Sequence, residues 1–227
     1  MVQAILWDVD GTLLDFDAAE SAAIRSLAQE VGFVGCDDAA VNRYREINHA
    51  LWKRLERGIC TREQVLIGRF QTFFAEMGWD PSRAEAFNRA YQPRLGETIV
   101  YRDDSLAVVK ALKTRVKQYV VSNGTVAAQT KKLERSGLGA LMDGVFLSER
   151  LGVEKPNPAF FEQVFAAIGP IDRSRVLLVG DSLTSDMQGG NAAGVRTAWY
   201  NPDRLPLPDS PRIDYDLANL NEVFSIL

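Results

Sequence analysis

Short apolar runs that end at acidic or turn-forming residues dominate the pattern of this sequence. Runs of this length without polar alternation are typical of strands that are buried on both faces of a parallel sheet. The pattern predicts five such strands and one short edge strand. Their ranges are 3–9, 118–121, 144–147, 175–179, 195–199 and, at the edge, 213–217.

Helical patterns separate these runs from about residue 100 onward. Residues 105–113 and 159–168 carry apolar side chains at helical spacing, and 126–136 follow Thr125, a suitable N-cap. Strand and helix therefore alternate repeatedly. This order predicts an α/β fold, in which a Rossmann-like parallel sheet has helices on both faces.

The segment from about residue 17 to residue 95 is different, because helix follows helix without a convincing strand. Thr61 to Gln64 fit a capping box before a helix over 65–77. Asp80-Pro81 open a further helix, which we expect to end before Pro93 and Gly96.

This all-helical block follows the first strand and precedes the others, so it is an insertion and not a tandem domain. A length of 227 residues fits one domain with a sizeable insertion. We expect a core of residues 1–16 and 97–227 and a helical cap of residues 17–96.

Composition excludes several classes of function. The chain has 26 basic and 30 acidic residues, hence a net charge of −4, which gives no basic footprint for nucleic acid or an anionic membrane. No apolar stretch reaches the roughly 18 residues that span a bilayer. Two cysteines and no secretory signal favour a cytoplasmic setting, and a single histidine excludes a multi-histidine metal site. We expect a monomer or homodimer that acts on a small molecule.

Four polar groups follow the predicted strands and carry the chemistry. They are Asp8-Val9-Asp10-Gly11-Thr12, Ser122-Asn123-Gly124, Lys155-Pro156, and Gly180-Asp181 with Asp186 five residues on. Lys155 lies several residues beyond its strand, whereas the others follow theirs directly. Ligands of open parallel sheets bind at the carboxyl ends of the strands, so we expect these groups to converge.

The residue types at this edge indicate phosphoryl chemistry. Asp8, Asp10, Asp181 and Asp186 are hard oxygen ligands, whose mutual repulsion a Mg²⁺ ion would relieve. An aspartate is a competent nucleophile toward phosphorus, and a second carboxylate can exchange protons with the leaving group and water.

A cradle for a phosphate anion is predicted beside these carboxylates. Lys155 supplies a positive charge, Ser122 a hydroxyl, and Asn123 and Gly124 backbone N–H groups, and we assign Thr12 to phosphate binding with them. Taken alone, the Ser122 motif is more often a turn and a lysine is more often solvated at the surface.

Together, in this order, the four groups resemble the motifs of the haloacid dehalogenase-like (HAD) phosphohydrolases. The resemblance implies a Rossmann-like core with a C1-type helical cap after the first strand. It implies Asp8 as nucleophile and Asp10 as acid and base. Mg²⁺ would be held by Asp8, the Asp10 backbone carbonyl and Asp181, with Asp186 in support. Ser122 and Lys155 would hold the phosphoryl group, and the dehalogenases of this family lack the second aspartate.

Four further stretches resemble the YjjG-type pyrimidine 5′-nucleotidases. They are Phe16-Asp17, Asn48 to Trp52, Gly68-Arg69-Phe70 and Val153 to Asn157. This resemblance implies nucleoside monophosphates, pyrimidine or noncanonical, as substrates.

Candidate substrate contacts in these stretches are Phe16, Asn48, Trp52 and Arg69, and Trp52 or Phe70 could stack on a base. The competing interpretation places the aromatic residues in the cap core and Arg69 at the surface.

Two other functions remain open at this point. The first is a phosphatase or mutase of small phosphometabolites such as phosphoglycolate or hexose phosphates. The second is not an enzyme but a receiver-like switch that accepts a phosphoryl group on an aspartate. Receiver domains have about half this length, no cap and no need of an acid at position 10.

Overall fold

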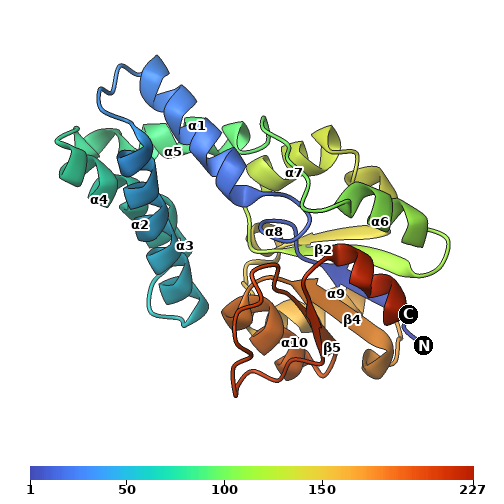
Figure 1. Ribbon diagram of the computed structural model, residues 1–227. Helices are drawn as coiled ribbons and strands as arrows, with labels where there is room; N and C mark the ends of the chain where they lie inside the picture. The colour runs from blue at the N-terminus through green and yellow to red at the C-terminus, as the bar shows by residue number, and fades with distance from the viewer. The chain divides into compact units, whose positions relative to one another are not determined.

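The computed structural model describes residues 1–227 and consists of two compact units (Figure 1). The sheet unit comprises Met1–Phe16 and Ile99–Leu227, and the helical unit comprises Asp17–Thr98. The helical unit is thus one continuous segment that is inserted between the first strand and the rest of the sheet unit. No helix combines the length and the apolar character that crossing a membrane requires.

The sheet has six strands in the order β3-β2-β1-β4-β5-β6, and every neighbouring pair is parallel. The strands are β1 (Ala4–Trp7), β2 (Lys117–Ser122), β3 (Gly144–Leu147), β4 (Val176–Gly180), β5 (Arg196–Tyr200) and β6 (Tyr215–Leu217). The predicted α/β class with a parallel sheet is confirmed, and β6 is the edge strand. β1 lies between β2 and β4, so the ends of these three strands are adjacent.

Alternate residues of each strand face opposite sides of the sheet, as the extended backbone requires. Ile5 and Trp7 of β1 pack with α6 (Ser105–Leu112), α7 (Val126–Arg135) and the C-terminal turn η5 (Leu220–Ser225). Ala4 and Leu6 pack with α9 (Pro158–Ile168) and α10 (Gln188–Ala193) on the other side. Both faces are therefore covered, which explains the uninterrupted apolar runs. Figure 1 shows α6 and α7 on one side of the sheet and α9 and α10 on the other.

The helices of the sheet unit are short and lie between the strands in sequence. They are α6 (Ser105–Leu112), α7 (Val126–Arg135), α8 (Ser148–Leu151), α9 (Pro158–Ile168) and α10 (Gln188–Ala193), with short turns η2 (Gly139–Leu141), η3 (Arg173–Arg175), η4 (Leu183–Met187) and η5 (Leu220–Ser225). Thr125 caps α7 by accepting the Ala128 N–H, as expected from its position.

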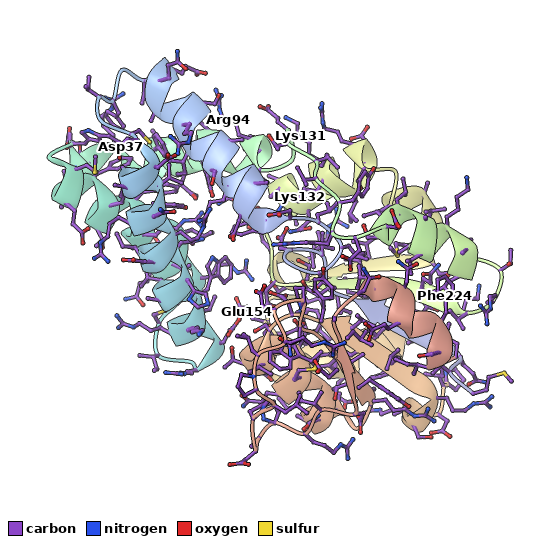
Figure 2. All side chains as sticks on the ribbon, in the orientation of Figure 1. Asp37, Arg94, Lys131, Lys132, Glu154 and Phe224 are labelled. Carbon is purple, nitrogen blue, oxygen red and sulfur yellow. The ribbon has the colours of Figure 1, made fainter.

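The helical unit has no strand. Its elements are α1 (Phe16–Glu30), α2 (Asp38–Glu56), α3 (Arg62–Leu66), α4 (Gly68–Met77), η1 (Pro81–Arg83) and α5 (Ala84–Arg94). The first residue of α1, Phe16, is the last residue of the first segment of the sheet unit. Asp37 caps α2 (Figure 2). Phe70, Phe73 and Phe74 of α4 are fully buried and contact aromatic rings of the other helices, so they form the core of this unit.

Two helix boundaries differ from the sequence prediction. The capping box at Thr61 and Gln64 is present, but the helix predicted over 65–77 is divided at Ile67 into α3 and α4. Pro93 lies inside the last turn of α5 and not beyond it. A proline there forfeits one backbone hydrogen bond close to the end of the helix, and the rest of the helix is unaffected.

The two chain segments that lead to the helical unit are joined within the sheet unit. Leu14 pairs with Tyr101 in an antiparallel bridge. The Asp15 N–H donates to the Val100 carbonyl at 2.8 Å, and the Arg102 N–H donates to the Leu13 carbonyl at 3.1 Å. The insertion therefore leaves and rejoins the sheet unit at one place.

Candidate active site

Asp8 follows β1 directly and is 7% exposed. Its backbone N–H donates to the Val179 carbonyl of β4 at 2.9 Å, which fixes the residue beyond the strand end. The chain then turns at Gly11, whose φ of +88° lies in the left-handed region. A Cβ atom at Gly11 would lie 2.5 Å from Asp181 Oδ2, so only glycine fits between the turn and that carboxylate.

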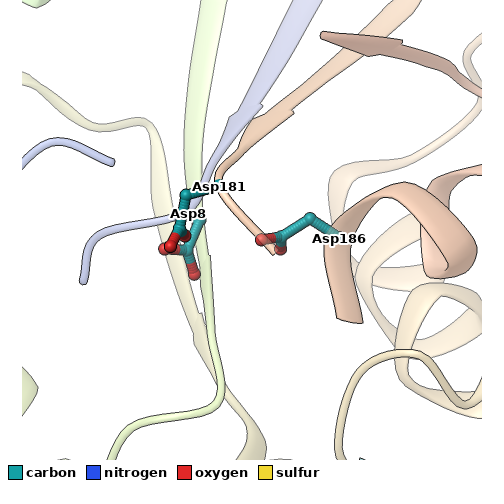
Figure 3. A group of neighbouring side chains, drawn as sticks. All are labelled: Asp8, Asp181 and Asp186. Carbon is teal, nitrogen blue, oxygen red and sulfur yellow. The ribbon is translucent and has the colours of Figure 1, made fainter. Parts of the chain in front are cut away.

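Asp181 and Asp186 reach the same place from β4. Asp181 follows the end of β4, and Asp186 lies in the π-helical turn η4, which Ser182 caps. One carboxylate oxygen from each of Asp8, Asp181 and Asp186 lies within 4.8 Å of the other two. Figure 3 shows that the Asp186 carboxylate points toward the other two. Three hard oxygen ligands at this spacing could hold a divalent cation.

Lys155 lies between two of these carboxylates. Its ammonium donates to Asp8 Oδ1 at 2.8 Å, to Asp186 Oδ1 at 2.6 Å and to the Val121 carbonyl at 2.8 Å. The residue is 1% exposed. A lysine several residues past its strand thus reaches the strand ends, as the sequence suggested.

Burial and the neighbouring charges together set the pKa values of Asp8 and Lys155. Burial raises the pKa of Asp8 well above its usual range; Lys155 lowers it, and Asp186 and Asp181 raise it again. Burial alone would lower the pKa of Lys155, but Asp186 and Asp8 outweigh burial and hold it above its ordinary value. The Lys155 ammonium is therefore charged, whereas burial favours the neutral form of Asp8.

The predicted phosphate cradle is largely occupied with bonds inside the protein. Ser122 ends β2 and is 1% exposed, and its hydroxyl accepts the Gly124 N–H at 3.0 Å. The Asn123 side chain accepts the Lys155 N–H at 2.8 Å and donates to the Lys155 carbonyl at 2.9 Å. Asn123 thus fixes the backbone that carries Lys155. The Thr12 hydroxyl donates to Asp181 Oδ1 at 3.3 Å. Phosphate binding by these residues stays a prediction.

Asp10 is not part of the carboxylate cluster, because α7 holds its side chain. Lys132 Nζ contacts Asp10 Oδ1, and Gln129 Nε2 donates to Asp10 Oδ2 at 2.5 Å. Sequence reasoning missed both residues. The available signal was their position three residues apart on the face of α7 that also carries the buried Ala128 and Leu133.

Asn48 and Arg69 lie inside the helical unit. Arg69 is 2% exposed and donates to Asn48 Oδ1 and to Asn88 Oδ1, each at 2.9 Å. Asn48 in turn donates to Glu20 Oε1 at 2.8 Å. The expectation that Arg69 is a surface charge is wrong, because its guanidinium is buried and both terminal nitrogens donate within this network, whereas Nε has no hydrogen-bond partner. Substrate contact by either residue stays a prediction and would require exchange of these bonds.

Phe16 and Trp52 are half-buried and each contacts a cation. The Lys132 ammonium lies 5.0 Å from the centre of the Phe16 ring, and the Arg62 guanidinium lies 5.8 Å from the Trp52 ring. Phe16 is thereby tied to the residues that hold Asp10. Substrate contact by Phe16 and stacking of a base on Trp52 stay predictions.

A parallel sheet with an aspartate, a lysine and two further aspartates at its strand ends defines a class of protein. The haloacid dehalogenase-like hydrolase family matches residues 2–194. The chain belongs to this family and is an enzyme. The alternative of a receiver-like switch is therefore wrong, since the match includes all four motifs and the whole inserted unit.

Among relatives, YfnB of Bacillus subtilis, a putative HAD-hydrolase, is 34% identical over 99% of this chain and 95% of its own. The pyrimidine 5′-nucleotidase PynA of Streptococcus pneumoniae is 34% identical over 98% of this chain and 94% of its own. The pyrimidine 5′-nucleotidase YjjG of Escherichia coli is 30% identical over 98% of this chain and 96% of its own.

Solved structures agree with the fold. The magnesium-bound crystal structure of YfnB covers 100% of this chain and 98% of its own, with a TM-score of 0.92 and 33% identity. The structure of the L-2-haloacid dehalogenase of Xanthobacter autotrophicus covers 100% of this chain and 98% of its own, with a TM-score of 0.74 and 18% identity. At that identity, the likeness to the dehalogenase shows the fold alone.

Proposed function

We propose that this enzyme is a Mg²⁺-dependent phosphomonoester hydrolase that acts through an aspartyl-phosphate on Asp8. The observation that carries the proposal is the Lys155 ammonium, held 2.8 Å from Asp8 and 2.6 Å from Asp186 at the strand ends. A nucleophile that attacks a phosphoryl dianion needs positive charge beside it. Here the charge is buried, fixed and in direct contact with the nucleophile.

The residues fit a magnesium ion. The cluster of Asp8, Asp181 and Asp186 offers oxygen ligands only, and burial penalises the charge on Asp8. When bound, Mg²⁺ would neutralise negative charge on the transferring phosphoryl group and on these carboxylates. In line with the family resemblance, we propose Asp8, Asp181 and the Asp10 backbone carbonyl as ligands, with Asp186 in support.

The reaction then proceeds in two displacements. An Asp8 oxygen attacks phosphorus, the bond from phosphorus to the ester oxygen breaks, and Asp10 gives its proton to the departing oxygen. Asp10 next takes a proton from water, which attacks the aspartyl-phosphate. The bond between phosphorus and the Asp8 oxygen breaks, which releases inorganic phosphate and restores the Asp8 carboxylate. Lys155 and Ser122 hold the phosphoryl oxygens throughout.

Asp10 favours a phosphatase over a dehalogenase. An alkoxide leaves only if it receives a proton, whereas a halide needs none. A carboxylate two residues from the nucleophile, with its own partners on α7, suits the first reaction.

For the substrate, we propose nucleoside 5′-monophosphates, pyrimidine or noncanonical, with the helical unit as the cap that selects them. The two pyrimidine 5′-nucleotidases, 34% and 30% identical over nearly the whole chain, support this choice. The helical unit is the segment inserted between the motif of Asp8 and that of Ser122, which is where the family resemblance places a cap.

The test is release of inorganic phosphate by the full chain with Mg²⁺, from UMP and dUMP and, in parallel, from AMP, phosphoglycolate and glucose 1-phosphate. We expect the pyrimidine nucleotides to be preferred, chelation of Mg²⁺ to abolish turnover, and Asp8→Asn to be inactive. Asp209→Asn, which removes an exposed carboxylate from a loop, is the matched control and stays active.

The outcomes separate the two levels of the proposal. Turnover of phosphoglycolate or glucose 1-phosphate without turnover of nucleotides would overturn the substrate class and leave the reaction. An Asp8→Asn variant with wild-type activity would overturn the mechanism.

A further inference from the structure

Both oxygens of the Asp10 carboxylate have a partner on the same helix. Lys132 Nζ contacts Oδ1, and Gln129 Nε2 donates to Oδ2 at 2.5 Å. The two partners lie three residues apart on α7, so they share one face of the helix. A carboxylate held at both oxygens cannot turn about its χ1 or χ2 bond without breaking these contacts.

The holding residues are built into the interior. Lys132 is 1% exposed and Gln129 is 0% exposed. A buried ammonium is costly unless it is paired, and the Asp10 carboxylate is its partner, with the Phe16 ring at 5.0 Å as a second contact. Lys132 is therefore not a solvated surface lysine, although the sequence around it reads as an ordinary amphipathic helix.

The glycine of the Ser122 motif makes room for this arrangement. A Cβ atom at Gly124 would lie 2.3 Å from Gln129 Nε2, which is closer than real contacts allow. The amide oxygen of Gln129, Oε1, is buried and has no hydrogen-bond partner. No bond at this oxygen therefore accounts for the buried position of the Gln129 side chain. The placement of Gln129 is explained by Asp10.

We propose that Lys132 and Gln129 are positioning residues, which hold the Asp10 carboxylate in the orientation from which it serves the leaving group and then water. This inference rests on the proposed phosphatase reaction. Each carboxylate oxygen has two lone pairs, so one contact per oxygen leaves a site free for the proton that Asp10 transfers. Fixing the carboxylate removes the rotational freedom that would otherwise have to be lost at each turnover.

The leaving group distinguishes positioning from a structural role. A nucleoside 5′-alkoxide needs a proton in order to depart, whereas 2,4-dinitrophenolate departs without one. Lys132→Met and Gln129→Leu should therefore lower kcat for UMP, or for the best alkyl phosphate of the screen, by about 100-fold. The first-turnover release of dinitrophenolate from 2,4-dinitrophenyl phosphate, which reports formation of the aspartyl-phosphate, should stay within about threefold of wild type.

KM for both substrates should stay near the wild-type value, because neither residue is proposed to touch the phosphoryl group. Lys132→Arg keeps a charged donor and should recover most of the lost kcat. Lys110→Met, which removes an exposed lysine from α6, is the matched control and behaves as wild type toward both substrates.

Gln129→Leu keeps the proposal testable if Lys132→Met does not fold, because it removes one neutral donor and leaves no buried charge unpaired. The proposal is overturned if folded Gln129→Leu loses activity equally on both substrates, changes only KM, or matches wild type on both. It falls together with the proposed function if the wild-type enzyme hydrolyses no phosphomonoester. It fails alone if wild type is active, Asp8→Asn is inactive, and the ratio between the substrates does not change.

Discussion

At the scale of single residues, Lys155 keeps the buried carboxylates together. Its ammonium joins Asp8 and Asp186, and both pairs are almost wholly out of solvent. The net worth of a buried ion pair is small, but removal of one partner strands the other charge. We therefore expect Lys155 to matter for folding as well as for phosphoryl binding.

Lys155→Met should lower the free energy of unfolding by about 3 kcal/mol in the presence of a chelator. Added Mg²⁺ should return part of that loss, because a cation among the carboxylates relieves the same repulsion. Urea unfolding with EDTA and with Mg²⁺ measures both effects, with Lys110→Met as the control for loss of a lysine. Equal stability of Lys155→Met and wild type in EDTA would show that the carboxylates do not depend on this ammonium.

Gly11 offers a second residue-scale test, with Gly32 as its match. Both have a left-handed φ, +88° and +74°, but a Cβ at Gly11 would meet Asp181 whereas one at Gly32 meets nothing within 4 Å. Each change to alanine should lower the free energy of unfolding by about 1 kcal/mol, because alanine is strained at a left-handed φ.

Only Gly11→Ala should also weaken Mg²⁺ binding, by about tenfold or more, since it displaces Asp181. Isothermal calorimetry with Mg²⁺ measures the affinity. Equal Mg²⁺ affinity in the two variants would mean that Asp181 is not a ligand or that it adapts.

Asp8, Ser122 and Asp181 were predictable because each lies at the end of a strand, and strand ends are readable from apolar runs; Lys155 lies several residues beyond its strand. Lys132 and Gln129 were not, because helical position alone does not say which face meets Asp10. Asn123 was assigned to phosphate binding, whereas its side-chain bonds to the Lys155 backbone depend on a loop conformation that spacing does not reveal.

At the scale of elements, a buried polar network joins the helices of the helical unit. Glu20 of α1 accepts from Asn48 of α2, which accepts from Arg69 of α4, which donates to Asn88 of α5. Sequence periodicity predicted the helices but not the network, since polar residues on a helix are usually exposed. The division at Ile67 and the position of Pro93 were likewise set by packing and by helix-end geometry.

Glu20 makes the stability of this unit depend on pH. Burial raises the pKa of Glu20 from 4.5 to about 7, and its bonds to Asn48 and Arg45 offset burial only in part. Between these two values the folded chain keeps a proton that the unfolded chain has lost. The contribution to stability therefore falls as pH rises through this window, by about 3 kcal/mol in all.

Glu20→Gln should abolish this fall, because glutamine keeps the neutral form at every pH. Relative to wild type, the variant should be unchanged near about pH 4 and more stable by up to about 3 kcal/mol near about pH 8. Urea unfolding of the full chain at the two pH values measures the difference. Glu63→Gln, at an exposed position of α3, is the control. A Glu20→Gln variant that loses stability equally at both pH values would contradict the sign.

At the scale of the whole molecule, the inserted unit interrupts the sheet unit at a single place. Leu14 bridges to Tyr101, and Asp15 bonds to Val100, so the two connecting segments already form the base of a hairpin. The sheet is complete without the insertion, because β1 is bonded to β2 and β4 along its length. The chain order of strand, helical block and strands predicted this arrangement, whereas the paired connecting segments required the structure.

Deletion of residues 17–98, with a turn of about four residues in their place, should therefore leave a folded sheet unit. The antiparallel segments around Leu14 and Tyr101 need only a tight turn to close. Circular dichroism and a cooperative unfolding transition measure folding.

Because Asp8, Lys155 and Asp186 all lie in the sheet unit, the shortened chain should still bind Mg²⁺ and turn over 2,4-dinitrophenyl phosphate. If the helical unit selects nucleotides, the preference for UMP over other monoesters should disappear with it. A shortened chain that folds and keeps that preference would place substrate selection in the sheet unit, and one that cannot fold would show that the units depend on each other.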